Sequence, residues 1–313
     1  MKKRIFTGCA TALVTPFNDD CSVNYPRLRE LVDEQINGGV DALVICGTTG
    51  ESATLDNDEH CRVLEEAIKT ADGRVPIIAG TGSNDTMYAA QLSQHAESIG
   101  ADGLLMVTPY YNKTSQTGLL NHYFYVADRV KTPIILYNVP SRTGTAIKPE
   151  TYKELAKHEN IVAVKEANGD ISSVAKTKSL VGDDLDIYSG NDDQIVPILS
   201  LGGIGVISVL SNILPRETHN ICEEFMKGNV QNARELQLKY LSLINALFSD
   251  VNPIPVKEAM NMTVMEYILK TRLTLAKNML IKEQTSVTSI SEACGFSSVS
   301  YFCRVFKENT GMT

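Results

Sequence analysis

The sequence predicts an α/β protein, a (β/α)8 (TIM) barrel followed by a short all-helical C-terminal appendage. Between residues 6 and 212, short runs of apolar, mostly β-branched residues recur and indicate strands buried on both faces. Segments with helical spacing of apolar residues lie between these runs, and turn residues end each run. Eight strands of this kind, each followed by a helix, form the pattern of a (β/α)8 barrel.

The elements follow one another in a regular order. In the first helix, Leu28, Leu31, Val32 and Ile36 give the helical spacing and Gly38-Gly39 closes it. We expect helices over residues 25–37, 58–70, up to 99, 117–130 and 149–158. The expected strands are residues 6–15, 41–46, 75–79, 103–107, 133–137, 161–165, 185–188 and 205–209.

Composition excludes several classes of protein. A net charge of −8 over 313 residues argues against a chain that binds nucleic acid along its whole length, although residues 262–313 hold six Lys and Arg against four Asp and Glu. The seven cysteines include no C-x-x-C pair, and the five histidines have no metal-ligand spacing, so we expect reduced thiols and no metal site. Neither a signal peptide nor a membrane span is indicated, which predicts a cytoplasmic protein.

Polar residues stand at the ends of five expected strands. The carboxyl ends of barrel strands open on one face, where active sites lie, so these side chains are expected to share one mouth. The candidates are Thr48, Thr49, Tyr111, Tyr137, Arg142, Lys165 and Gly190.

Lys165 ends the strand Ile161-Val-Ala-Val and is the candidate nucleophile. A partly desolvated amine favours its neutral form, which can attack a keto group and form a Schiff base. Taken alone, the strand fits a lysine that reaches solvent better than a nucleophile; the polar residues at the other strand ends reverse this preference and favour chemistry. Tyr137 can shuttle protons, Thr48 can link two phenols, and the planar Arg142 guanidinium matches a carboxylate.

Two glycine-rich loops follow the second and third strands, Gly47-Thr-Thr-Gly50 and Gly80-Thr-Gly82. Neither matches a nucleotide-binding fingerprint. Loops of this kind can hold a small carboxylate with their backbone amides, and we expect that use here.

Residues 1–261 resemble the dihydrodipicolinate synthase/N-acetylneuraminate lyase family. The lysine and Tyr137 match the whole family, whereas Thr48-Thr49, Tyr111 and Arg142 match its synthase branch. The motifs that carry the resemblance are Gly47-Thr-Thr-Gly-Glu-Ser-Ala-Thr54, Thr108-Pro-Tyr-Tyr-Asn112, Tyr137-Asn-Val-Pro-Ser-Arg-Thr-Gly144, Val164-Lys165-Glu166-Ala167 and Asn252-Pro-Ile-Pro-Val-Lys257.

The resemblance implies a lyase that condenses pyruvate with L-aspartate semialdehyde to 4-hydroxy-tetrahydrodipicolinate, in diaminopimelate and lysine biosynthesis. No cofactor is implied beyond the covalent imine on Lys165. Tyr137, Thr48 and Tyr111 would relay protons, and Tyr111 would reach the site of a neighbouring subunit in a homodimer or homotetramer. The implied substrate-binding residues are Thr49, Arg142, Gly190 and Ile207.

Some members of this family are inhibited by lysine at a dimer interface. Inhibited members typically carry His at position 57 and Glu at position 88, where this chain has Asn and Tyr. Losing that carboxylate removes a partner for the incoming ammonium, so we expect weak or absent feedback. The matching positions are Ser52, Ala53, Asn57, His60, Asn84, Tyr88 and Tyr110.

The remaining residues depart from the family. Leu269, Leu273, Ala276 and Leu280 share one face of a helix over 266–280. Residues 288–307 resemble the C-terminal helix-turn-helix of AraC-type regulators, with Gly295 at the turn and a core of Phe302, Val305 and Phe306.

We therefore expect a catalytic barrel over 1–228, the start of the family's helical C-terminal region over 229–261 and a foreign helical tail over 262–313. Two other readings stay open. One is a sibling pyruvate-dependent aldolase that acts on a sugar acid. The other is an inactive chimera with residual sequence-specific DNA binding, which few cations of the tail would support.

Overall fold

The computed structural model describes residues 2–261, 264–282, 286–296 and 298–310. The expected boundary at residue 262 therefore lies outside the described residues. The chain forms two compact units, residues 1–244 and 245–313, and each is described by itself.

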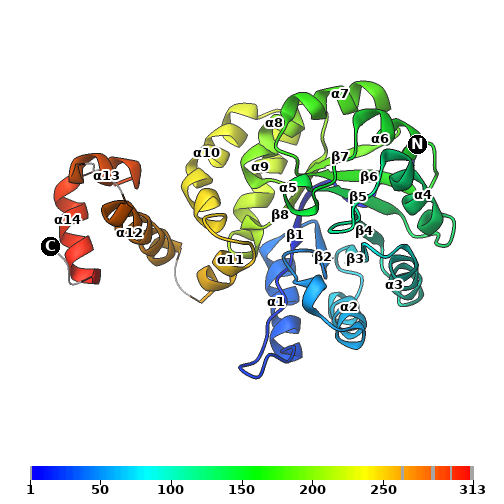
Figure 1. Cartoon of the computed structure of the whole chain (residues 1–313), viewed down its shortest axis with the longest axis horizontal. Coiled ribbons are helices and arrows are strands. Elements are labelled where there is room, and N and C mark those ends of the chain that lie inside the picture. Colours follow the sequence, from blue (N-terminus) through cyan, green and yellow to red (C-terminus); the bar gives the residue numbers. More distant parts are fainter. Residues whose placement is uncertain (1, 262–263, 283–285, 297, 311–313) are drawn as a thin grey trace. The chain divides into compact units, whose positions relative to one another are not determined.

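The first unit is a closed barrel of eight parallel strands, each paired with its neighbours in chain order and the last with the first (Figure 1). This confirms the predicted fold. The strands are β1 (Gly8–Ala12), β2 (Ala42–Ile45), β3 (Ile77–Gly80), β4 (Gly103–Val107), β5 (Ile134–Asn138), β6 (Ile161–Glu166), β7 (Asp186–Ser189) and β8 (Gly205–Ser208).

The strands are buried on both faces, as their apolar runs predict. All six residues of β6 are buried, and so are all five of β5. Side chains alternate along a strand, so one set fills the barrel and the other meets the helices. The cluster that includes Val44, Ile78, Tyr137, Tyr188 and Ile207 belongs to this core.

Glycines close the barrel where β1 meets β8. Gly8 pairs with Gly205, and a Cβ atom placed on Gly205 would lie 2.1 Å from the carbonyl oxygen of Gly8. No side chain fits at that distance, so this seam depends on two backbones in direct approach.

Helices follow the strands, and several begin where the sequence provides an N-terminal cap. Asp56 and Glu59 form a capping box at the start of α2, and Asp85 accepts backbone hydrogen bonds at the start of α3. The longer helices of this unit are α1 (Tyr25–Gly38), α2 (Asn57–Ala71), α3 (Thr86–Ser98), α4 (Gln116–Ala127), α7 (Ile171–Val181), α9 (Pro215–Met226) and α10 (Val230–Leu247), which runs past the end of the unit. Shorter helices are α5 (Pro140–Thr143), α6 (Pro149–Leu155), α8 (Ile195–Ser200), η1 (Ser52–Thr54), η2 (Asp192–Gln194) and η3 (Leu210–Asn212).

Two helices end several residues earlier than expected, and the first of them, expected over 117–130, is α4 and ends at Ala127. The predicted helix over 149–158 ends as α6 at Leu155, because the backbone amides of Lys157 and His158 turn back to carbonyl oxygens three residues earlier.

The second unit contains only helices among its described residues. Its core joins α12 to α14, with Leu273, Ala276, Phe302, Val305 and Phe306 buried together. Gly295 follows α13 with φ of +77°, which confirms the predicted glycine turn. The helices are α11 (Ile254–Ala259), α12 (Val264–Lys282), α13 (Val287–Ala293) and α14 (Val299–Thr310).

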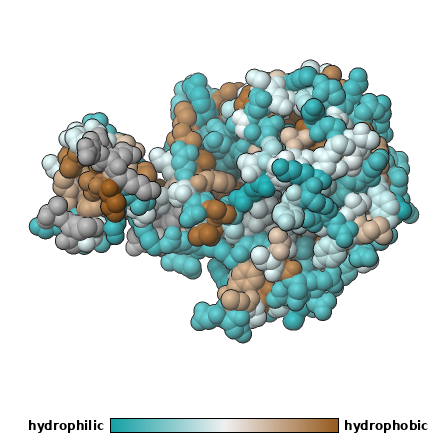
Figure 2. Space-filling model, in the orientation of Figure 1, coloured by the Kyte–Doolittle hydropathy of each residue, from teal (hydrophilic) through white to brown (hydrophobic). Residues whose placement is uncertain are grey.

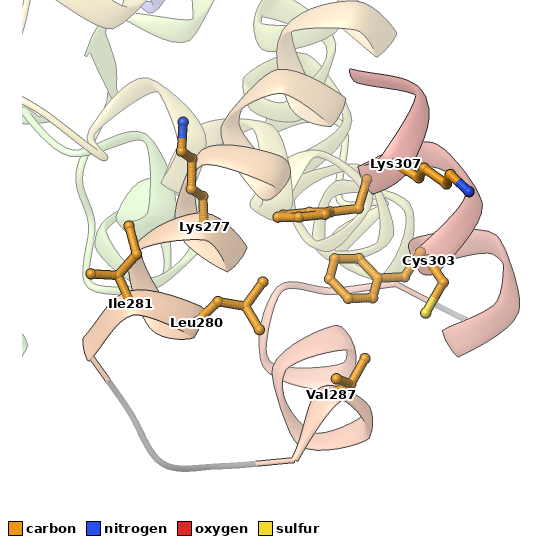
Figure 3. A pocket seen from close by; sticks show the side chains of 8 residues that line it. Lys277, Leu280, Ile281, Val287, Cys303 and Lys307 are labelled. Carbon is orange, nitrogen blue, oxygen red and sulfur yellow. The ribbon is translucent and has the colours of Figure 1, made fainter. Parts of the chain in front are cut away.

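An apolar pocket of about 510 Å³ lies beside this helical core (Figure 3). Leu280, expected on the buried face of α12, is 40% exposed here because it lies in the last turn of the helix. The ammonium groups of Lys277 and Lys307 point away from the pocket, so their carbon stems contribute the lining.

The surface of the barrel unit on the face shown in Figure 2 is mostly hydrophilic, with scattered apolar side chains. Within the described ranges, no helix has the length and apolar character to cross a bilayer. The same residues hold no group of three or more His, Cys, Asp or Glu arranged to bind a metal ion.

Candidate active site

Lys165 lies at the carboxyl end of β6 with only 5% of its surface exposed. Burial lowers the pKa of its amine to about 8; Asp192 opposes this shift and Arg142 adds to it. The apolar strand that precedes Lys165 places the amine where water cannot solvate its charge. At pH 7 about a tenth of such an amine is neutral, far more than for a solvated lysine. The side chain is therefore suited to nucleophilic attack.

Tyr137 is the direct cross-strand neighbour of Lys165. The two residues are paired in register between β5 and β6, and Lys165 Nζ lies 4.4 Å from the centroid of the Tyr137 ring. Burial raises the pKa of the Tyr137 phenol, while Arg142 and a hydrogen bond with Thr48 oppose the rise. The phenol therefore keeps its proton near neutral pH and can donate it to a group beside the lysine.

The loop after β2 carries Thr48 and Thr49 and is held by close backbone contacts. A Cβ atom on Gly50 would lie 3.0 Å from the carbonyl oxygen of Leu13, and Thr15 Oγ1 donates a hydrogen bond of 2.7 Å to the carbonyl oxygen of Gly50. Thr49 is buried, whereas Thr48 is half-buried and reaches Tyr137. Tight turns thus fix both hydroxyl groups.

Gly190 closes in on the lysine from the loop after β7. A Cβ atom at this position would lie 3.2 Å from Lys165 Cε and 2.7 Å from Ala167 Cβ. The Gly190 amide also donates a hydrogen bond of 2.7 Å to the carbonyl oxygen of Glu166. Ile207, on β8, is fully buried in the same barrel core as Tyr137. Glycine leaves room at the lysine that any other residue would fill.

Arg142 and Tyr111 differ in their relation to this group. Arg142, in α5, is exposed, yet its charge affects the pKa values of both Lys165 and Tyr137. Tyr111 is 90% exposed and has φ of +67°, a left-handed backbone conformation that a bulky residue rarely adopts. Direct contacts and charge effects thus link Lys165, Tyr137, Thr48, Gly190 and Arg142, whereas the Tyr111 ring is directed to solvent in the single chain.

The residues that match the family's lysine site lie mostly around η1, α2 and the start of α3. His60 is buried, its Nε2 atom lies 2.9 Å from the carbonyl oxygen of Gly80, and burial lowers its pKa. Tyr88 Oη donates a hydrogen bond of 3.5 Å to Asn57 Oδ1, and burial raises the pKa of the Tyr88 phenol, with a smaller contribution from Tyr110. Ser52 and Ala53 begin the short helix η1, and Asn84 immediately precedes the Asp85 cap of α3.

Asp192 is a buried acid close to Lys165 that the sequence did not single out. It is fully buried in η2, and its Oδ2 atom accepts hydrogen bonds from the backbone amides of Val209 and Leu210 at 3.0 and 2.9 Å. Its charge raises the pKa of Lys165, while burial raises its own pKa. Asp192 comes shortly after β7, and the other candidates were selected because they are at or just after the ends of strands. Selecting every polar residue at these positions would have included Asp192.

A desolvated lysine and a protonated tyrosine at the carboxyl ends of adjacent barrel strands match the class of enzymes that activate carbonyl substrates through an imine. The chain belongs to the dihydrodipicolinate synthetase family, whose model matches residues 5–291. This match extends past residue 261, where the resemblance was expected to end. A second model, for bacterial regulatory helix-turn-helix proteins of the AraC family, matches residues 280–313.

Individual relatives agree with this family. The chain is 51% identical over 289 residues to the 4-hydroxy-tetrahydrodipicolinate synthase of Acetivibrio thermocellus, a match that covers 91% of this chain and 98% of that protein. The synthase of Caldicellulosiruptor saccharolyticus is 59% identical over 258 residues, or 82% and 87% of the two chains. A solved structure, the Cyanidioschyzon merolae enzyme with lysine bound, matches with a TM-score of 0.81 at 38% identity, covering 85% of this chain and 90% of that one.

Proposed function

We propose that the chain is a pyruvate-dependent lyase that condenses pyruvate with L-aspartate semialdehyde to 4-hydroxy-tetrahydrodipicolinate and water. The relatives at 51–59% identity carry this name, and they are covered over most of their length. The observation that carries the mechanism is Lys165, buried and with its pKa lowered to about 8, beside the Tyr137 ring.

The reaction begins at the lysine. The neutral amine of Lys165 attacks the keto carbon of pyruvate, and the resulting carbinolamine loses water as the C=N bond forms. Tyr137 donates the proton that leaves with the hydroxyl group, and Thr48 returns a proton along the hydrogen bond that it shares with Tyr137. Thr49 and the backbone of its loop hold the pyruvate carboxylate, while Gly190 and Ile207 shape the space around the methyl group.

The second substrate then joins the enamine. A methyl proton passes to the relay of Tyr137, Thr48 and Tyr111, which converts the imine to an enamine. The enamine carbon then attacks the aldehyde carbon of aspartate semialdehyde, and the relay gives a proton to the aldehyde oxygen, which becomes the hydroxyl group of the product. The guanidinium of Arg142 holds the carboxylate of this aldehyde. The substrate's own amine closes the ring on the former keto carbon, and the Lys165 amine is released. Binding energy at Arg142 orients the aldehyde for the new carbon–carbon bond.

The proton relay includes Tyr111 of a neighbouring subunit. Support comes from its 90% exposure and left-handed backbone, which hold the ring away from its own chain. A homodimer, alone or within a homotetramer, would place this ring beside Tyr137 of the second copy.

We place the enzyme in the cytoplasm, with free cysteines at all seven positions in keeping with a reducing compartment.

Lysine feedback is proposed to be weak or absent. Tyr88 interacts with Asn57 through an uncharged hydrogen bond, so neither supplies a carboxylate for an ammonium group, and the His60 ring already contacts the Gly80 carbonyl. Activity measured against increasing L-lysine should stay nearly constant through the sub-millimolar range. Half-inhibition in that range would contradict the proposal.

Borohydride reduction in the presence of pyruvate tests the central step. The wild-type chain should gain one pyruvate-sized adduct in its intact mass, located on the peptide that contains Lys165, and Lys165→Ala should gain none. Consumption of L-aspartate semialdehyde, compared with that of a sugar aldehyde, then separates the synthase from a sibling aldolase. A folded wild-type protein without an adduct would overturn the proposed function and favour an inactive chimera.

A further inference from the structure

A buried carboxylate lies next to the proposed nucleophile and has no part in the mechanism above. Glu166 directly follows Lys165 on β6, so its side chain points to the opposite face of the strand, toward the helices. The carboxylate accepts hydrogen bonds from Asn138 Nδ2 at 2.9 Å, from Tyr152 Oη at 2.9 Å and from the backbone amide of Asn168 at 3.0 Å. Glu166 is thus enclosed by donors from three elements of the fold.

The hydrogen bond between Asn138 and Glu166 joins the same two strands that carry the active-site pair. In the register of β5 and β6, Tyr137 pairs with Lys165 and Asn138 pairs with Glu166, one residue further on. Asn138 is tied further: its Oδ1 atom accepts the backbone amide of Ile147 at 3.0 Å. A side-chain hydrogen bond therefore joins the ends of β5 and β6 one residue beyond Tyr137 and Lys165.

The hydrogen bond from Tyr152 connects Glu166 to a helix. Tyr152 lies on α6, is fully buried, and donates its hydroxyl hydrogen to Glu166 Oε2. On the other side, the backbone carbonyl of Glu166 accepts the amide of Gly190, the residue that meets Lys165 Cε. Hydrogen bonds from one residue therefore reach α6, β5 and the loop over the lysine.

The hydrogen bonds of Glu166 are of an unusual kind for a buried acid. Burial raises the pKa of Glu166 to about 7, and the groups that oppose this rise are hydrogen-bond donors, led by Tyr152 and Asn138, rather than cations. A buried acceptor of this sort needs its donors in place, because an unpaired polar group inside a protein is strongly destabilising. Each donor is consequently held in one position, and this restricts the relative motion of β5 and β6, which carry Asn138 and Glu166.

We propose that Asn138, Glu166 and Tyr152 are positioning residues, which hold Lys165 and Tyr137 at the separation and orientation that imine formation requires. None of the three touches substrate. This inference rests on the proposed function, because it concerns the rate of the imine step at Lys165. Supporting side chains behind a reactive group commonly decide whether its geometry is productive.

Tyr152→Phe tests the proposal, since it removes one donor and leaves the volume of the side chain. Displacement of a reacting group by about 1 Å lowers a rate by about 100-fold, and we expect this smaller change to slow trapping of the pyruvate imine about tenfold. The matched control is Tyr123→Phe: Tyr123 is also fully buried, and its hydroxyl donates to the carbonyl oxygen of Met106 at 3.3 Å, outside this group.

The readout is the time course of borohydride-trapped adduct at saturating pyruvate, followed by intact mass. A positioning defect lowers the rate constant while every chain is eventually trapped, whereas partial unfolding lowers the final amount of adduct. We expect full trapping at a slower rate for Tyr152→Phe and a wild-type rate for Tyr123→Phe. Glu166→Gln keeps the shape but turns an acceptor into a donor, and should slow trapping more than Tyr152→Phe.

The outcomes separate the two proposals. A wild-type chain that traps no pyruvate removes the proposed function and this inference with it. A wild-type chain that traps pyruvate, with Tyr152→Phe and Glu166→Gln at the same rate, leaves the function standing and overturns the positioning role. Equal slowing by Tyr152→Phe and Tyr123→Phe would also overturn it, because any lost buried hydrogen bond would then have the same effect.

Discussion

The barrel unit and the C-terminal unit differ in what their cores enclose. The barrel packs helices around a closed sheet, and this double layer buries charged groups such as Lys165, Glu166 and Asp192. The C-terminal unit packs three helices around one apolar cluster, and the buried polar residues described there, Asn252 and Ser291, are uncharged. The two layers of the barrel desolvate a lysine and lower the pKa of its amine. The apolar cluster of the C-terminal unit contributes only to the stability of that unit.

The largest difference should come from changing the space around the lysine. Gly190→Val adds a Cβ that would lie 3.2 Å from Lys165 Cε, together with two further methyl groups, so we expect imine formation to fall by about 100-fold. Borohydride trapping with pyruvate measures the rate. Gly182→Ala is the control, because its added Cβ meets open space and only backbone strain at φ of +54° results. An unchanged rate in Gly190→Val would show that the lysine has more room than this contact implies.

A change in the C-terminal core should act on stability alone. Phe302→Ala removes a fully enclosed ring and should destabilise that unit by about 3–5 kcal/mol. Hydrogen exchange of residues 264–310 would show the loss, while the rate of pyruvate trapping should stay within twofold of wild type. Tyr301→Ala, on the exposed side of the same helix, is the milder control. Loss of trapping in Phe302→Ala would mean that the barrel depends on this unit.

The smallest expected effects are opposite shifts in pH dependence. Trapping of pyruvate by the wild type should rise with pH around an apparent pKa of about 8, as the amine of Lys165 loses its proton. Arg142→Leu removes a cation that lowers this pKa and should move the profile to higher pH, whereas Asp192→Asn should move it to lower pH. Shifts in the same direction would contradict the assigned charges.

The same lysine affects stability. Its pKa is lower in the folded chain, so the unfolded chain holds more protons between about pH 8 and pH 10.5. The free energy of unfolding should therefore rise with pH in that window because of this group, and Lys165→Met should remove that part of the slope. Urea titrations at several pH values measure the slope of both chains.

The fold could be predicted because each strand is apolar on both faces and ends at a turn signal. The same rule placed Lys165 and Tyr137 at one mouth, and the structure brings them to adjacent positions in register. The helix-turn-helix core was also confirmed at Phe302, Val305 and Phe306, because helical spacing reveals a buried face. Helical spacing does not predict burial at the ends of helices, as at Leu280, which is 40% exposed in the last turn of α12.

The rest of the site depends on contacts between distant residues. Glu166 reads in the sequence as one polar residue at a strand end, and its enclosure depends on Asn138 across the sheet and Tyr152 on a helix. No local pattern encodes that convergence, because the register of neighbouring strands decides which side chains meet. The catalytic and substrate-binding roles of all the site residues, Lys165 and Tyr137 included, stay predictions.

The pairing of β1 with β8 at Gly8 and Gly205 also sets the earliest stage of synthesis at which the barrel can close. Gly8 has no partner on that edge until Gly205 has been synthesised, so the first strand must wait through most of translation with one side unpaired. Contacts so distant along the chain slow folding and leave a strand edge open to wrong partners meanwhile. The last barrel strand, β8, is synthesised before the C-terminal helices α11 to α14, so the chain already carries all eight strands when those helices are made.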